Sequence, residues 1–269
     1  MAVNRIGLIA GNGRFPIIFA EAAKRKGTEI VAIAINEETS QELKQYVDKI
    51  YWIGVGELEK LFLILSQEKL TSVIMAGQVR HKLLFEKNIK IDPKMLSLLG
   101  AIKDKKTDSI IGEVAKKLGS LGIKLLDSTL FLSDYIPQKG VLTKSQPDER
   151  VVKDIEFGRD IAKAIAGLDI GQTVVVKDKV VLAVESIEGT DEAIKRGALY
   201  GKESIVVVKV SKPNQDMRFD IPIIGPDTIN LLKGLKASCI AIDAGKTLII
   251  DKDKVIKLAD ESGITIVAI

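Results

Sequence analysis

The side chains best suited to chemistry in this chain gather in one proline-containing segment, residues 212–228. Asp216, Arg218 and Asp220 lie within five consecutive positions of this segment. A carboxylate can orient a water molecule or hold a hard cation, and a guanidinium can form paired hydrogen bonds with an oxyanion. The prolines stiffen the segment, so these side chains would be held in place before a ligand arrives. A surface ion pair between Arg218 and one of the aspartates is the structural alternative.

A second carboxylate cluster, Glu188–Asp191, follows a strand-like run and opens a helical one. Helix capping would account for it structurally, because Thr190 is a suitable N-cap residue and Asp191 interacts favourably with the helix dipole. The functional alternative is that the helix N-terminus and Asp191 face a phosphate group or its cation. Glu185, on the preceding strand, could join them in that case.

A glycine turn joins the first expected strand to the first expected helix. Gly11, Asn12 and Gly13 form this turn, and Pro16 follows in the first helical turn. Glycines allow a phosphate to approach the backbone, and a helix N-terminus supplies free N–H groups. The dinucleotide fingerprint is incomplete, because its third glycine position falls on Pro16. A phosphate or nucleotide site is the favoured interpretation, and a plain strand–helix turn is the alternative.

Another expected strand ends at Gly77 and Gln78. Ligands of open α/β sheets bind at the carboxyl ends of the strands, so Gln78 could contact a base or a sugar. A simple glycine turn explains the same residues equally well.

Short apolar runs alternate with amphipathic stretches along the first half of the chain. This alternation predicts βαβ units and a parallel sheet, that is, a Rossmann-like α/β domain. The expected strands are 6–10, 29–35, 50–53, 72–76 and 123–126. The expected helices are 15–26, 42–47, 57–68, 95–100 and 108–118.

The pattern breaks at residues 133–148, which are rich in turn-forming residues. We therefore expect an N-terminal domain over 1–135, a linker over 136–148 and a C-terminal domain over 149–269. In the second half, two apolar runs flank Lys177–Lys179, which is typical of a β-hairpin. Further strands and helices follow, so the C-terminal domain is expected to be an α/β domain with a mixed sheet.

The composition excludes several classes of function. The 269 residues are 46% hydrophobic and carry a net charge of +4, so the chain can bury a core but lacks the basic surface of a nucleic-acid-binding protein. The one histidine, His81, argues against a histidine-rich zinc site and against serine–histidine hydrolysis. Any metal should be a hard cation held by oxygen atoms, such as Mg²⁺. The one cysteine, Cys239, is expected in the core, and a chain without disulfides fits the cytoplasm.

Taken together, these stretches resemble one family, the LpxI-type UDP-2,3-diacylglucosamine diphosphatases of lipid A biosynthesis. Each matching piece is short, but the ordered set covers nearly the whole chain and is specific. The pieces are Gly7–Gly13, Ala76–Val79, Leu168–Gln172, Leu182–Glu185, Glu188–Asp191, Lys212–Pro213 with Gln215, Arg218–Pro222, Ile224–Gly225 and Ala244–Gly245.

The resemblance implies a reaction in which water cleaves the diphosphate of UDP-2,3-diacylglucosamine. The products would be UMP and 2,3-diacylglucosamine 1-phosphate (lipid X), and the cofactor would be Mg²⁺. The family's essential aspartate corresponds to Asp220, which would hold Mg²⁺ or orient the water. Asp191 is the second candidate for catalysis and for metal binding, whereas Asp216 matches less securely and is a helper or a turn residue.

The chemistry of the residues themselves gives the remaining positions roles in such a reaction. Arg218 would clamp phosphate oxygens as part of the catalytic set. The expected substrate-binding residues are Gly11, Asn12, Gly13, Gly77, Gln78, Thr190, Lys209 and Lys212. A substrate with two acyl chains would bring the protein into peripheral contact with the inner membrane. The apolar residues Leu83–Phe85 and Met95–Leu99 are expected in the core, with an acyl-chain groove as the alternative.

Two other classes of function stay open. One is a nicotinamide-dependent oxidoreductase that uses the Gly11–Gly13 turn, and the missing third glycine counts against it. The other is a non-catalytic protein that binds a nucleotide sugar or a lipid and returns it intact. A homodimer is left open as well, and no nucleic-acid partner is expected.

Overall fold

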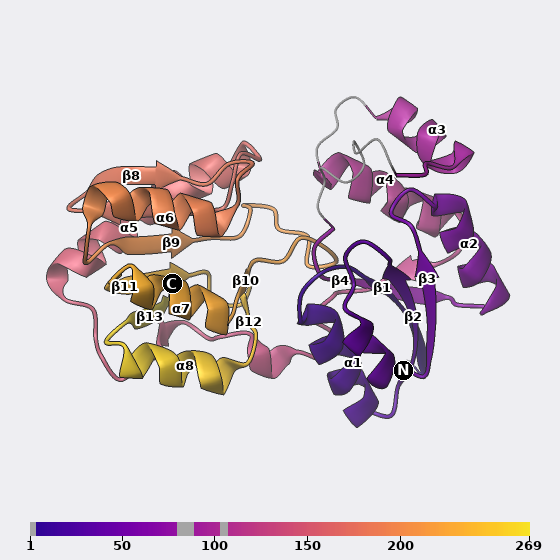
Figure 1. The fold of residues 1–269 in the computed structure, drawn as a ribbon, viewed down its shortest axis with the longest axis horizontal. Helices are drawn as coiled ribbons and strands as arrows, with labels where there is room; N and C mark the ends of the chain where they lie inside the picture. Colours follow the sequence, from indigo (N-terminus) through magenta and orange to yellow (C-terminus); the bar gives the residue numbers. More distant parts are fainter. Residues whose placement is uncertain (1–3, 80–88, 103–106) are drawn as a thin grey trace. The chain divides into compact units, whose positions relative to one another are not determined.

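The computed structural model describes residues 4–79, 89–102 and 107–269, with no side chain described for 107 and 108, and the chain forms two compact domains (Figure 1). The N-terminal domain comprises Met1–Ser133 and Met217–Asp220, and the C-terminal domain comprises Asp134–Asp216 and Ile221–Ile269. A short, late piece of the chain therefore belongs to the N-terminal domain. His81 and the apolar residues Leu83–Phe85 lie outside the described residues.

The N-terminal domain is built on a parallel sheet of the order β3-β2-β1-β4-β5. Its strands are β1 Arg5–Ala10, β2 Glu29–Ile35, β3 Lys49–Ile53, β4 Ser72–Ala76 and β5 Lys124–Leu125. The strand order reverses between β1 and β4, which is where open α/β sheets bind ligands. The predicted Rossmann-like domain with a parallel sheet is confirmed.

Helices cover both faces of this sheet (Figure 1). The helical elements are α1 Phe15–Arg25, η1 Gln41–Gln45, α2 Leu58–Gln67, α3 Pro93–Ala101 and α4 Thr107–Ser120. Alternate residues of β2 explain the two layers: Val31, Ile33 and Ile35 share a core with α2, α3 and α4, while α1 contacts β2 and β4 on the other side. The predicted helix at 42–47 is instead the short 3₁₀ turn η1, because only one turn lies between Ser40, which caps it, and the next strand.

The C-terminal domain contains a mixed sheet of the order β6-β13-β11-β9-β7-β8, as predicted. Strands β9, β11 and β13 are parallel, β7 runs antiparallel to β8 and β9, and β6 pairs antiparallel with β13. The strands are β6 Gly140–Val141, β7 Thr173–Lys177, β8 Val180–Val184, β9 Val206–Lys209, β11 Cys239–Ile242 and β13 Thr265–Ala268. A separate parallel pair joins β10 Ile223–Ile224 to β12 Leu248–Ile249.

Two helical layers sandwich the mixed sheet. The helical elements are η3 Ser133–Tyr135, α5 Glu149–Gly167, α6 Thr190–Gly201, α7 Pro226–Gly234 and α8 Lys252–Glu261. Helix α5 packs on one face with Val174, Val176 and Cys239, and helices α6, α7 and α8 share the other core. Cys239 is buried, so the prediction of a core cysteine is confirmed, and burial raises the pKa of its thiol to about 12. No helix among the described residues is both long enough and apolar enough to cross a membrane.

An ionic cluster closes the amino-terminal edge of the N-terminal sheet. Glu68, at the end of α2, accepts hydrogen bonds from Lys49, Tyr51 and Arg5, the last at 2.7 Å. These donors, with Lys49 the largest contributor, lower the pKa of Glu68 from 4.5 to about 2. The cluster ties β1, β3 and α2 together at the end of the sheet opposite to the loops that carry the predicted site.

We expect acid to weaken the N-terminal domain through Glu68. Its pKa is lower in the folded chain than in the unfolded chain, so its stabilisation is fully present above about pH 4.5 and is lost as the pH falls towards about 2. Replacing Glu68→Gln should lower the urea midpoint near neutral pH and flatten its dependence on pH in this window. The matched control is Glu29→Gln, because Glu29 is half-exposed and Arg5 is its one ion-pair partner among the described residues. Equal pH dependence in wild type and Glu68→Gln would contradict this assignment.

Candidate functional site

The two predicted glycine turns lie against each other at the carboxyl edge of the N-terminal sheet. The amide of Gly11 donates to the carbonyl of Ala76 at 2.9 Å, and the amide of Asn12 donates to the carbonyl of Gln78 at 2.7 Å. Asn12 and Gln78 form an antiparallel bridge. The structure therefore brings together five predicted substrate-binding residues at the switch point between β1 and β4: Gly11, Asn12, Gly13, Gly77 and Gln78.

The three positions at this edge require glycine for different physical reasons. A Cβ on Gly11 would lie 2.5 Å from the carbonyl oxygen of Gln78, and a Cβ on Gly77 would lie 2.5 Å from that of Asn12. These two glycines let the turns approach each other, a requirement within the protein itself. Gly13 is exposed and has a φ of +85°, and no described atom lies within 4 Å of the position of its Cβ. Open space therefore lies beside Gly13, in contrast to Gly11 and Gly77.

Helix α1 begins directly after this turn. Arg14 occupies its N-cap position, no side chain of the described structure caps its first turn, and Pro16 lies within that turn as predicted. The N–H groups of an uncapped first turn point towards the carboxyl edge of the sheet, where they suit an anion.

Arg218 and Asp220 lie on the N-terminal domain, although most of their neighbours in sequence belong to the other domain. Both residues are exposed, whereas Phe219 between them is partly buried and packs, like Met75 and Val79, against the apolar core of the domain. Ser128, which sequence reasoning missed, hydrogen-bonds the backbone of this piece. The available signal was the polar triplet 127–129 directly after the strand expected at 123–126.

In the C-terminal domain, Lys209, Thr190 and Glu185 form one chain of hydrogen bonds. Lys209 Nζ donates to Thr190 Oγ1 at 2.7 Å, and this hydroxyl donates to Glu185 Oε1 at 2.8 Å. Strands β8 and β9 both end at this edge, and α6 begins there, so three elements deliver the three groups. The prediction that Thr190 caps α6 is wrong: Gly189, with a φ of 88°, occupies the N-cap position, and the Thr190 hydroxyl is used for the bond to Glu185.

Lys209 is a buried cation, with 9% of its surface exposed. Within the described part of the chain, Thr190 Oγ1 is the one hydrogen-bond partner of its ammonium group. An ammonium group carries three donors, and burial without compensating partners is costly. A phosphate oxygen is the kind of group that would satisfy the remaining donors.

The other predicted residues of this domain have distinct surroundings. Asp191 is exposed at the second position of α6, where a carboxylate interacts favourably with the helix dipole. Lys212 forms an ion pair with Asp169 at 2.8 Å, which engages part of its charge. No group of three His, Cys, Asp or Glu side chains among the described residues is arranged to hold a metal ion.

A second polar cluster of this domain lies beside the first and was missed as well. Asp243 is buried after β11 and accepts from the backbone amide and the hydroxyl of Ser211, each at 2.6 Å. Lys163 of α5 bonds both residues, reaching Asp243 Oδ2 at 2.5 Å. The cluster fixes the start of the segment 212–228 to the sheet. The sequence signal for this cluster was that Ser211 and Asp243 each follow directly after an apolar, strand-like run.

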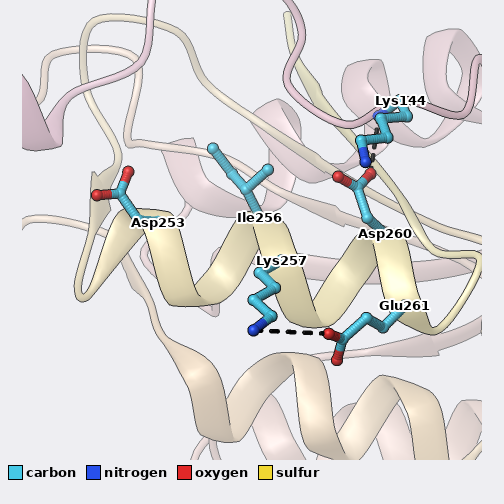
Figure 2. Close-up of a pocket in the computed structure, with 6 residues that line it drawn as sticks. All are labelled: Lys144, Asp253, Ile256, Lys257, Asp260 and Glu261. Atoms are coloured by element: carbon cyan, nitrogen blue, oxygen red, sulfur yellow. Dashed lines mark hydrogen bonds and ion pairs between the residues drawn. The ribbon is translucent and has the colours of Figure 1, made fainter.

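One surface hollow of the described structure lies away from these residues. It has a volume of about 370 Å³ and lies over α8 of the C-terminal domain. Figure 2 shows the residues that line it: Lys144, Asp253, Ile256, Lys257, Asp260 and Glu261. Lys257 and Glu261 pair across one turn of the helix, and Asp260 accepts from the backbone of Lys144. None of the predicted site residues lines this hollow.

We expect the three glycines to differ in their tolerance of alanine. Gly11→Ala and Gly77→Ala force a methyl group against backbone atoms, so each should destabilise the N-terminal domain by several kcal/mol, whereas Gly13→Ala meets only the strain of a positive φ, about 1 kcal/mol. Urea denaturation of the three variants measures the order. A Gly11→Ala variant as stable as Gly13→Ala would show that the two turns do not depend on their close approach.

Comparison with solved structures adds little. The biotin carboxylase domain of the 2-oxoglutarate carboxylase of Hydrogenobacter thermophilus matches with a TM-score of 0.25 and 17% identity over 74% of this chain and 40% of that chain. The N5-carboxyaminoimidazole ribonucleotide synthetase of Thermotoga maritima matches with a TM-score of 0.24 and 16% identity over 71% and 42%. The chain spans less than half the length of these solved chains, and likenesses this weak carry no argument.

Comparison with sequences is decisive. A relative from Caulobacter vibrioides, described as "UDP-2,3-diacylglucosamine pyrophosphatase LpxI", is 29% identical over 280 aligned positions, which cover 99% of this chain and 98% of the relative. The family model of the LpxI N-terminal domain matches residues 5–135, and that of the LpxI C-terminal domain matches residues 138–267. Both domains, in the family's order and together spanning nearly every residue, show that this chain belongs to the LpxI family.

Proposed function

We propose that this protein hydrolyses the diphosphate of UDP-2,3-diacylglucosamine, giving UMP and 2,3-diacylglucosamine 1-phosphate (lipid X) for lipid A biosynthesis. The observation that carries the proposal is the full-length match to a relative described as a UDP-2,3-diacylglucosamine pyrophosphatase. The geometry supports it, because each domain presents polar groups suited to phosphate at the carboxyl edge of its sheet.

A diphosphate repels an incoming water molecule, so a catalyst must neutralise the phosphate oxygens. In the C-terminal domain, Lys209 is buried and its ammonium has donors that no described residue uses, while Thr190 holds it at 2.7 Å. On the N-terminal domain, Arg218 is exposed and carries a planar fork of donors that matches two phosphate oxygens. Lys212 and the turn around Gly13 bind further oxygens or the uridine nucleotide, and Asn12 and Gln78 bind beside them.

Asp220 is the proposed catalytic carboxylate. Its side chain is exposed, and its backbone lies in the left-handed region with a φ of 52°. A residue other than glycine in this region costs about 1 kcal/mol, and such strain is found where a side chain must be aimed. Asp220 orients the attacking water or binds a Mg²⁺ ion, and Asp191 assists.

Mg²⁺ fits these residues as a cofactor shared with the substrate. Mg²⁺ usually binds one or two carboxylates together with substrate phosphate oxygens, so it does not require a cluster of protein ligands. Asp220 is the first candidate ligand and Asp191 the second. When bound, the ion would neutralise charge on the phosphate oxygens. The enzyme would work at the cytoplasmic surface of the inner membrane, where a substrate with two acyl chains resides.

We expect Asp220→Asn to abolish most of the release of UMP from UDP-2,3-diacylglucosamine with Mg²⁺. Asparagine tolerates the left-handed backbone of this position, so the variant removes the charge without adding strain. A fall in kcat of about 10²- to 10⁴-fold is expected for the loss of a group that acts on the water. Asp227→Asn, in the first turn of α7, is the control.

Several outcomes of this assay would contradict the proposal. Activity retained in Asp220→Asn would contradict the site. Intact substrate recovered from wild-type protein that binds it would indicate a binding protein without catalysis. Turnover of a nicotinamide cofactor with no release of UMP would instead indicate an oxidoreductase.

We expect Lys209→Met to weaken phosphate recognition, because it keeps the apolar stem and removes the buried ammonium. The loss of one charged hydrogen bond to phosphate should lower kcat/KM by about 10- to 100-fold. The matched control is Lys177→Met in the same sheet, because its ammonium bonds only the carbonyls of Gly201 and Glu203 among the described residues. Equal losses in the two variants would show that the role of Lys209 is structural.

A further inference from the structure

We propose that Ser128 is a positioning residue for the reaction: it fixes the backbone of Arg218–Asp220, hereafter the reactive tripeptide, to the carboxyl edge of the N-terminal sheet. The inference rests on the proposed function, because it assumes that Arg218 and Asp220 act on the substrate. It adds the residue that determines where these two side chains lie.

Ser128 contacts two consecutive peptide groups at the start of the reactive tripeptide. Its amide donates to the carbonyl of Met217 at 2.9 Å. Its hydroxyl lies 2.6 Å from the carbonyl oxygen of Arg218 and 2.7 Å from that of Met75, at the end of β4. The one hydroxyl proton is therefore shared between the tripeptide and the sheet. Because Ser128 is fully buried, water cannot replace these bonds.

Ser128 is itself held in place by its neighbours in sequence. The carboxylate of Asp127 accepts from the amide of Thr129 at 2.7 Å and from its hydroxyl at 2.6 Å, which forms a tight turn around Ser128. Strand β5, which pairs with β4, ends two residues before this turn. The hydrogen bonds from Ser128 to Met217 and Arg218, hereafter the anchor, are thus continuous with the regular hydrogen bonding of the sheet. The anchor is rigid for that reason.

Exposed and partly buried side chains alternate along the reactive tripeptide. Phe219 packs partly against the apolar core of the N-terminal domain, while Arg218 and Asp220 on either side are exposed. The guanidinium of Arg218 also lies 5.8 Å from the centre of the Phe219 ring, close enough for a cation–π interaction. Phe219 and Ser128 therefore hold the tripeptide by its side chain and by its backbone.

The anchor explains how the strain at Asp220 persists. A left-handed aspartate relaxes unless the backbone on its N-terminal side is fixed. Ser128 supplies this fixation three residues and two residues before Asp220, at the carbonyls of Met217 and Arg218. Loss of the hydroxyl should leave the fold of the domain intact and allow the reactive tripeptide to open locally.

The rate of trypsin cleavage measures how often the anchor opens, and this measurement does not depend on catalysis. The bond Arg218–Phe219 is a trypsin site, whereas Lys212 precedes a proline and resists cleavage. In Ser128→Ala, we expect the rate of cleavage at this bond, followed by the mass of fragment 219–269, to rise about tenfold, as one lost hydrogen bond predicts. We also expect kcat to fall about tenfold, with KM within twofold and an unchanged Tm. Ser128→Thr, which keeps the hydroxyl, should restore part of the activity.

The matched control is Ser120→Ala, because the hydroxyl of Ser120 also bonds a backbone carbonyl of the N-terminal domain, that of Lys117, at an exposed place. It should change neither cleavage nor kcat. Phe219→Leu provides a second variant that perturbs the same anchor from the side of the core, and it should raise cleavage and lower kcat in the same way. If Ser128→Ala fails to fold, Phe219→Leu still tests whether the anchor positions the reactive tripeptide.

Unchanged cleavage in both Ser128→Ala and Phe219→Leu would overturn the anchor. Increased cleavage with an unchanged kcat would overturn its role in positioning, although a wild type that releases UMP would leave the proposed function intact. A wild type that releases no UMP would refute the proposed function alone, and the comparison of cleavage rates would still decide whether Ser128 holds the reactive tripeptide.

Discussion

The carbonyl groups at the carboxyl edge of the N-terminal sheet must find donors, and much of the candidate site follows from this constraint. The strands end there, so their last carbonyls lose the ladder that satisfied them. The Gly11 amide donates to the carbonyl of Ala76, and the Asn12 amide donates to that of Gln78. Ser128 shares its hydroxyl between Met75 and Arg218. Satisfying these few groups brings two turns and one distant piece of chain to a single edge.

In the C-terminal domain, the polar groups at the carboxyl edge of the sheet include buried charges. Lys209 ends β9 in a buried place, where its ammonium is stabilised by the hydroxyl of Thr190 and, through it, by the carboxylate of Glu185. Lys163, Ser211 and Asp243 form a second buried group at the next strand. The second group is saturated within the protein, whereas the first retains donors among the described residues. This difference is consistent with a structural role for the Lys163 cluster and supports the phosphate-binding role proposed for Lys209.

The fold was largely predictable, because apolar periodicity reports which residues face a core. The parallel and mixed sheets, the hairpin around Asp178 and the buried Cys239 all followed from local patterns. The cap of α6 was mispredicted for a physical reason: a threonine at a helix start is a good cap in isolation, but here its hydroxyl meets a carboxylate from a neighbouring strand. Local propensity cannot anticipate a partner that only the sheet supplies.

The sequence by itself determined the family, the two α/β domains and the residue types of the candidate site. Their motifs are short, local and ordered along the chain, and that information does not depend on folding. Only the tertiary structure decided that Arg218 and Asp220 belong to the N-terminal domain, that Ser128 holds them and that Lys209 is buried beside Thr190. These contacts join residues up to 90 positions apart in the chain. Burial and hydrogen bonding at such separations arise from packing, and no local pattern encodes them.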